Sequence, residues 1–309
     1  ALNRNSMGNH RSQTDRKSPT RLGLLTFSEL PEWRRDNPCI LTGYRPETNS
    51  WKECFKGVLL WHNQTVNIWS HLIGTIISCA LLSLSFLRDD WSIFERLDVL
   101  HDYAGQPVNT PKAFDGAGMM LFIFGCVVCF ACSTVFHSAM CHSESVRILV
   151  LGTLNYFSTF HYAFYCDPSI RNIYIAMMTI SGCTGIYLVY SPSYASPAYR
   201  RMRTYTFFAL GFVVIFPFIH AIHKYGVHHV SRGVSLKWLF IEALAYVCGA
   251  LMYAEKCPEF LVPGRFDYGA SHQIFHVCSM VATFSHYVSL SRSYQFWLYG
   301  PGTGICPAI

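Results

Sequence analysis

The sequence predicts an all-α membrane protein, a seven-transmembrane helical bundle with its N-terminus cytosolic and its C-terminus luminal or extracellular. Of the 309 residues, 51% are hydrophobic and only 14% are charged, whereas soluble globular proteins carry about 25% charged residues. The apolar residues also gather in stretches of the ~20 residues that a bilayer crossing needs. The composition therefore argues against an ordinary soluble enzyme and against a disordered chain.

Seven stretches of the chain are long and apolar enough to span a bilayer. Six contain no Asp, Glu, Lys or Arg, and the seventh, 238–254, is interrupted only by Glu242. Lipid offers backbone amides no partner, so we expect each stretch to be a helix. In chain order the predicted spans are 67–86, 117–140, 148–166, 173–190, 204–222, 238–254 and 271–291. The bundle thus occupies 67–291, and 292–309 form a short luminal or extracellular tail.

The chain before the first span divides into two parts. Residues 1–50 are polar, rich in Arg, Ser and Asn, and contain no apolar core of signal-peptide length, so we expect a largely disordered cytosolic segment. In 51–66, Trp51, Phe55 and Leu59 recur at helical spacing, with lysines on the opposite side. This pattern predicts an amphipathic helix that lies in the membrane interface, and the alternative is a plain amphipathic linker.

The basic residues set the predicted orientation. The net charge of +6 is too small and too scattered to favour a nucleic-acid partner. Seven spans place the termini on opposite sides, and Lys and Arg are enriched in cytosolic loops. The N-terminal side carries eleven basic residues: Arg34, Arg35, Arg45, Lys52, Lys56, Arg147, Arg200, Arg201, Arg203, Lys256 and Arg265. The other side carries seven: Arg88, Arg96, Lys112, Arg171, Lys224, Arg232 and Arg292.

Three histidines are predicted to meet at the N-terminal side of the bundle. The second span ends there with His137, one turn after Ser133, and the seventh span begins there with His272 and His276. His272 and His276 are four residues apart and lie about 6 Å apart along one helix face. Three protein ligands with a fourth position open are typical of catalytic zinc sites. The alternative is that each histidine only hydrogen-bonds a neighbouring helix.

Five spaced segments of the chain carry a recognisable pattern. They are NQTVNIWSH at 63–71, STVFHSAMCHSE at 133–144, YAFYC at 162–166, PEFLVPGRFD at 258–267 and SHQIFH at 271–276. These segments resemble the progestin and adipoQ receptor family and occur in the order of that family. The similarity extends from about Asp36 to about Leu290.

This resemblance implies seven helices, a cytosolic N-terminus and a Zn²⁺ ion held by His137, His272 and His276. Ser133 matches the serine of a wider superfamily of membrane hydrolases, where it would stabilise an oxyanion. Some motifs are similar to the Golgi-resident family member that traps Raf kinase, and others to the adiponectin receptors. The implied partners are a Raf-type kinase or a protein ligand, and membrane lipids such as ceramide or fatty acid. The implied location is the Golgi or the plasma membrane.

The chain departs from the family pattern at two carboxylates. The family has an aspartate at the start of the third helix, but this chain is about ten residues shorter between Cys141 and Cys166 and has no aspartate there. Glu144 is the nearest carboxylate that could substitute as general base. The glutamate of the NQTVNIWSH segment is Gln64 here.

Two classes of function therefore remain open at the level of sequence. The first is a receptor or signalling scaffold in which zinc clamps two helices together. The second is a zinc-dependent, ceramidase-like lipid amidohydrolase, with Ser133 as oxyanion stabiliser and Glu144 as substitute base. The loss of the aspartate favours the receptor or scaffold, because a positioned base matters more for hydrolysis than for metal binding.

Overall fold

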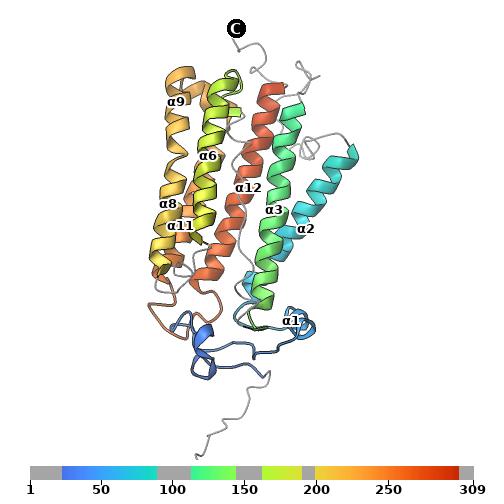
Figure 1. Cartoon of the computed structure of the whole chain (residues 1–309), viewed down its shortest axis with the longest axis vertical. Coiled ribbons are helices and arrows are strands. Elements are labelled where there is room, and N and C mark those ends of the chain that lie inside the picture. The colour runs from blue at the N-terminus through green and yellow to red at the C-terminus, as the bar shows by residue number, and fades with distance from the viewer. Residues whose placement is uncertain (1–22, 89–112, 144–161, 190–198, 299–309) are drawn as a thin grey trace, which may run out of the picture.

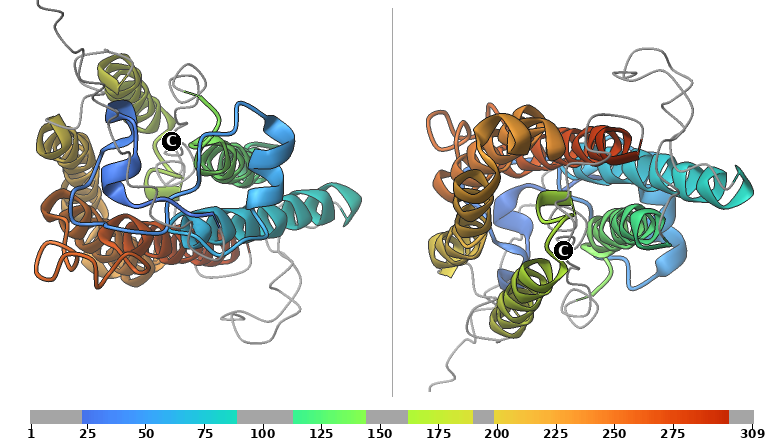
Figure 2. Two further views of the ribbon diagram at one scale, coloured as in Figure 1. Left: turned by 90° about the horizontal axis from the view of Figure 1, so that it is seen from below. Right: turned by 90° about the horizontal axis from the view of Figure 1, so that it is seen from above.

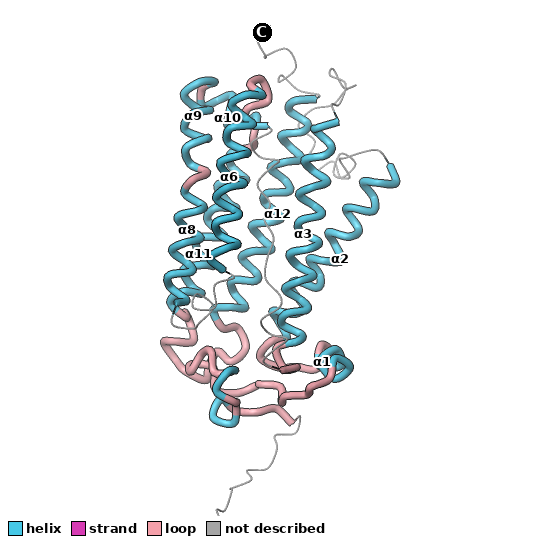
Figure 3. Tube along the Cα trace, viewed as in Figure 1, coloured by secondary structure: helices cyan, strands magenta, loops and turns pink. Residues whose placement is uncertain are grey.

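The computed structural model describes residues 23–88, 113–143, 162–189 and 199–298. Within these ranges the regular structure is helical, and Leu25 and Tyr44 form one isolated bridge. The long helices run side by side as a bundle, as Figure 1 shows. Figure 3 shows that most of the described loops gather at one end of this bundle, together with the N-terminal segment.

The helices follow the predicted apolar windows closely. The short α1 (Trp51–Gly57) precedes the bundle. The bundle helices are α2 (Thr65–Arg88), α3 (Ala113–Ala139), α6 (Pro168–Val189), α8 (Arg200–Phe212), α9 (Ile215–Tyr225), α10 (Val227–Gly233), α11 (Leu236–Glu255) and α12 (Ser271–Leu298). Three segments of them are long and apolar enough to cross a membrane: Thr65–Ser85, Ala117–Ala139 and Leu236–Glu255. The count of seven spans stays a prediction, since most of 148–166 lies outside the described residues.

The window predicted at 204–222 is divided between two helices. Between α8 and α9 the chain makes a tighter turn, in which Val214 N donates to Gly211 O at 3.1 Å. Pro217 lies in the first turn of α9 and has no N–H to donate to the carbonyl four residues earlier. The missing donor explains why one continuous helix does not form across 204–222.

The amphipathic helix predicted over 51–66 ends early, at Gly57. The turn that follows is held by local hydrogen bonds. Thr65 Oγ1 accepts from His62 N at 2.9 Å and donates to Leu60 O at 3.1 Å. Such side-chain bonds offer the backbone an alternative to the helical ladder. Trp51 and Phe55 are exposed on α1, and the interfacial position of this helix remains a prediction.

Residues 23–50 differ from the expected disorder. They cross beneath the ends of the bundle helices, as the view from below in Figure 2 shows. The Asp267 carboxylate accepts hydrogen bonds from Leu41 N (2.7 Å), Thr42 N (2.9 Å) and Thr42 Oγ1 (2.6 Å). The Glu259 carboxylate, which is fully buried, accepts from Asn37 Nδ2 at 3.0 Å. Residues 1–22 lie outside the described part.

Two helix pairs make the closest packing in the bundle. α12 packs along α11, α2 packs along α3, and α12 also contacts α2. Glycine permits the approach of α11 to α12, because a Cβ added to Gly249 would lie 2.7 Å from the Cβ of Cys278. α12 therefore joins the two halves of the described bundle.

We predict that Gly249→Ala destabilises the protein by about 1–3 kcal/mol, because the new methyl group overlaps a Cβ that cannot rotate away. The matched control is Gly211→Ala on α8, where an added Cβ meets nothing within 4 Å. Thermal unfolding of the detergent-solubilised variants measures the difference. Equal melting temperatures for the two variants would contradict the close approach of α11 and α12.

Candidate metal centre

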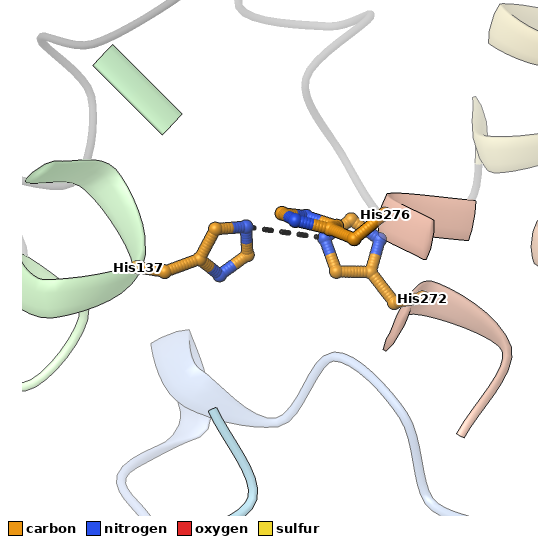
Figure 4. A group of neighbouring side chains, drawn as sticks. All are labelled: His137, His272 and His276. Atoms are coloured by element: carbon orange, nitrogen blue, oxygen red, sulfur yellow. Dashed lines mark hydrogen bonds between the residues drawn. The ribbon is translucent and has the colours of Figure 1, made fainter. Parts of the chain in front are cut away.

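The three predicted histidines converge at the end of the bundle that holds the N-terminal segment. His137 lies in the last turn of α3, and His272 and His276 lie in the first two turns of α12. Figure 4 shows the three rings pointing toward one another from these two helices. One nitrogen from each ring can be chosen so that all lie within 4.8 Å of one another. His137 and His276 are only 3% and 2% exposed and His272 is partly buried, so two of the three rings are shielded from solvent.

One spacing within the cluster matches that of two ligands on one metal ion. The Nε2 atoms of His137 and His272 are 3.3 Å apart. Two nitrogens that bind one tetrahedral zinc at ~2.0–2.1 Å would themselves be separated by roughly 3.3–3.4 Å. The Nδ1 atoms of His272 and His276 are buried and have no hydrogen-bond partner among the described residues. These three side chains could therefore hold a metal ion, and their neutral nitrogen donors suit a transition metal.

Gln64 sets the orientation of the His137 ring. Its Oε1 atom accepts from His137 Nδ1 at 2.8 Å and from Asn67 Nδ2 at 2.8 Å. An amide oxygen can only accept, so the His137 proton sits on Nδ1. The lone pair of Nε2 then faces His272 and is available to a metal.

Aromatic rings hold the other two histidines in place. His71 on α2 stacks on His276, with ring centroids 3.9 Å apart, and its Nε2 lies 3.1 Å from Ser279 Oγ. Tyr253 lies 5.2 Å from the His272 ring. The His276 and His272 rings are thus constrained by groups on α2 and α11, as Gln64 constrains His137.

Arg45 supports the cluster from the N-terminal segment. Its guanidinium is buried and donates to the carbonyls of His137 (2.6 Å) and Ser138 (3.1 Å). These carbonyls lie at the C-terminal end of α3, where the helix dipole favours a positive charge. Burial lowers the pKa of Arg45, because removal from water disfavours the charged form.

His62 supports the cluster indirectly, through the backbone of Gln64. Burial, and then the nearby charge of Arg45, lower the pKa of His62 to about 4. The ring is therefore neutral at physiological pH, and its Nδ1 accepts a hydrogen bond from Gln64 N at 3.0 Å. This contact fixes the backbone of Gln64.

Of the two proposed catalytic residues, the structure describes only Ser133. Ser133 lies one turn before His137 on α3, about 6 Å along the helix, and is partly buried. Glu144, the proposed substitute base, lies outside the described residues. The serine is thus near the three histidines, whereas the position of the base stays open.

Other polar groups within the bundle form pairs away from the three histidines. His286 on α12 lies 2.8 Å from the Glu242 carboxylate on α11. His220 Nδ1 and the hydroxyl of Tyr174 are also 2.8 Å apart. These residues satisfy one another, as buried polar groups in a membrane must.

Sequence reasoning missed the supporting residues of the cluster. The sequence marks Gln64 only as a lost family carboxylate, His71 only as part of a motif, and Arg45 only as one of the basic residues that set orientation. A signal was available, because Gln64, Asn67 and His71 recur at i, i+3 and i+7 and so share one face of a helix. A polar stripe at that spacing within an apolar span indicates a buried polar site.

Comparisons with known proteins agree with the resemblance seen in the sequence. The Haemolysin-III related family matches residues 59–287. ADIPOR-like receptor IZH1 of Eremothecium gossypii is 32% identical over 285 residues, which cover 88% of this chain and 85% of that protein. Heptahelical transmembrane protein 3 of Arabidopsis thaliana is 29% identical, covering 91% of this chain and 90% of that protein.

Animal relatives are similar over a shorter share of their own length. Progestin and adipoQ receptor-like protein 1 of Caenorhabditis elegans is 31% identical over 87% of this chain, and the match spans 60% of that protein. The Adiponectin receptor protein of Drosophila melanogaster is 31% identical over 86% of this chain and 58% of its own length. The apolar helices described above and the heptahelical relative from Arabidopsis thaliana indicate an integral membrane protein. The chain belongs to the Haemolysin-III related family, with the progestin and adipoQ receptor-like proteins among its relatives.

Proposed function

We propose that the protein is a multi-pass membrane receptor or signalling scaffold of the progestin and adipoQ receptor type. A zinc ion would be bound between the end of α3 and the beginning of α12. The observation that carries this proposal is the convergence of His137, His272 and His276 from two distant parts of the chain. Buried ionisable residues are costly within a membrane protein and gather mainly where they are used. Zinc would then tie α3 to α12.

The choice of zinc rests on the donor set. Three imidazole nitrogens and no carboxylate among the clustered residues suit zinc better than calcium or magnesium, which prefer oxygen ligands. Bound zinc would supply a strong positive charge and a Lewis acid at this place. The protein itself supplies three imidazole rings that neighbouring side chains hold in place.

A receptor or scaffold also agrees with the names of the relatives, two of which are called receptors. Its partners would be a protein ligand, a cytosolic signalling protein such as a Raf-type kinase, or membrane lipids. Its location would be the Golgi or the plasma membrane.

The alternative is a zinc-dependent lipid amidohydrolase of the ceramidase type. It is favoured by one observation, the position of Ser133 one turn from His137 on α3. In such an enzyme the Ser133 hydroxyl would donate to the oxygen of the amide that is cleaved. A general base is also needed, and Glu144 is the residue we propose for it.

The orientation we propose places the histidine cluster and the N-terminus on the cytosolic side of a seven-helix bundle. The basic residues support this, as do the cysteines. At the histidine end, Cys54 and Cys141 are free thiols with their sulfurs 3.5 Å apart. Cys166 is disulfide-bonded, and its neighbour Tyr165 stacks on Trp297 at the far end of α12. Disulfides persist in luminal and extracellular compartments and are rare in the cytosol.

We predict that the purified protein contains about one zinc per chain, and that His272→Ala or His276→Ala removes it, because two ligands do not complete a site of this kind. Elemental analysis of protein purified in detergent gives the ratio. The matched control is His223→Ala, an exposed histidine on α9 that should leave the zinc content unchanged. Unchanged zinc in both ligand variants, or none in the parent protein, would refute the proposal.

We predict that an epitope tag placed before residue 23 is accessible from the cytosol, and a tag after Tyr299 from the lumen or the outside. The reasons are the eleven basic residues against seven and the odd number of spans. Antibody binding before and after selective permeabilisation of the plasma membrane reads both positions. A C-terminal tag exposed to the cytosol would overturn the orientation and move the histidine cluster to the other side.

We predict that ceramide hydrolysis by this chain is weak or absent, and that inserting a segment with Leu-Asp-Tyr before Ile148 raises it. A positioned base contributes typically ~10²–10⁴-fold to a rate. Turnover of a ceramide in detergent micelles measures this, with Ser133→Ala and Glu144→Gln as comparisons. Robust turnover that Glu144→Gln abolishes would replace the scaffold by the hydrolase. Robust turnover that is unchanged in Glu144→Gln would show that another group is the base.

A further inference from the structure

We propose that Gln64 is a positioning residue of the metal site, which prepares His137 to bind the ion through Nε2 and links the start of α2 to the two helices that carry the histidines. This inference rests on the proposed zinc site and adds to it a residue that does not itself touch the ion. Three independent features of the structure support it.

The first feature is the direction of the hydrogen bond at His137. Neutral imidazole carries its proton on one nitrogen only, and the other nitrogen then has the lone pair. Because His137 Nδ1 donates to Gln64 Oε1 at 2.8 Å, the lone pair lies on Nε2. Nε2 is also the atom that faces His272 at 3.3 Å. The ring is therefore held in the tautomer and orientation that a metal requires.

The second feature is that the oxygen of Gln64 accepts a second hydrogen bond. Asn67 lies one turn later on α2, is only 1% exposed, and donates from Nδ2 to the same oxygen at 2.8 Å. The Gln64 amide is therefore tied to α2 through Asn67 as well as to α3 through His137.

The third feature is that the Gln64 backbone is also fixed. Gln64 N donates to the Nδ1 of His62 at 3.0 Å, and Gln64 O accepts from Ile68 N at 3.0 Å in the first turn of α2. The His62 ring lies against Gly57 O at 3.1 Å. A side chain anchored at both its backbone and its amide loses little freedom when the metal binds.

The other two rings of the cluster differ from His137 in this respect. The Nδ1 atoms of His272 and His276 lack a hydrogen-bond partner within the described ranges. Histidine ligands to metals usually donate their second N–H to a carbonyl, carboxylate or amide, and loss of that partner typically costs ~10–100-fold in metal affinity. Loss of the Gln64 acceptor should therefore lower the metal affinity of the site by about this factor.

The test compares zinc affinity, measured by competition with a chromophoric chelator, in the full-length protein and two variants. Gln64→Leu removes the acceptor, so the His137 proton is free to move to Nε2 and the affinity should fall about 10–100-fold. Gln64→Glu keeps an oxygen acceptor for both donors and makes the imidazole a better ligand, so its affinity should equal or exceed that of the parent protein. The absorption spectrum of the Co²⁺-substituted protein should change in Gln64→Leu and stay tetrahedral in Gln64→Glu.

The matched control is Gln273→Leu. Gln273 is also a buried glutamine at this end of the bundle, but its hydrogen-bond partners among the described residues are backbone groups: its Nε2 donates to the Asn63 carbonyl at 2.7 Å and its Oε1 accepts from Gly269 N. The Gln273→Leu substitution should lower thermal stability and keep the zinc affinity within about threefold of that of the parent protein. Similar losses of affinity in Gln64→Leu and Gln273→Leu, no loss in Gln64→Leu, or no recovery in Gln64→Glu would each overturn the proposal. A parent protein that binds no zinc would instead refute the proposed function, so the two failures are distinguishable.

Discussion

The meeting of the end of α3 with the beginning of α12 is the contact on which this structure depends. Helix ends leave backbone groups without partners, and a bilayer provides no water for them. Here Arg45 supplies donors to the last carbonyls of α3, and the Glu259 carboxylate accepts from Ser271 N (2.7 Å) and Ser271 Oγ (2.5 Å) at the first turn of α12. With both ends satisfied, three imidazoles can occupy the space between them.

The buried charged groups Arg45, Glu259 and Asp267 at this end of the molecule each form hydrogen bonds with backbone or side-chain partners. Glu259 and Asp267 are buried in the loop between α11 and α12, and each accepts at least three hydrogen bonds from donors in other segments. An unpaired buried charge would cost several kcal/mol. The loop and the N-terminal segment therefore stabilise each other, and neither would keep its conformation alone.

Much of the bundle was predictable because lipid restricts the chain to helices. The windows at 67–86, 238–254 and 271–291 match α2, α11 and α12 closely, and helix parity brought His137 to the depth of His272 and His276. The break near Val213 was not predicted. An apolar window measures hydropathy only, so it does not show that Pro217 has no N–H for a helical hydrogen bond. Residues 23–50 were misjudged for a different reason. Their order comes from partners such as Asp267, which lies more than 200 residues away along the chain, and composition alone cannot reveal such partners.

The N-terminal segment has a practical meaning for any shortened form of this protein. Arg45 and Gln64 both precede α2, and Leu25 pairs with Tyr44 on the same strip of chain. A protein cut to begin at the first bundle helix would still contain every histidine of the cluster. It would nevertheless lack the guanidinium beneath α3 and the amide behind His137. The folded unit therefore includes the chain from at least Leu25, well before the first apolar helix, and a truncation that removes Arg45 and Gln64 removes part of the centre itself.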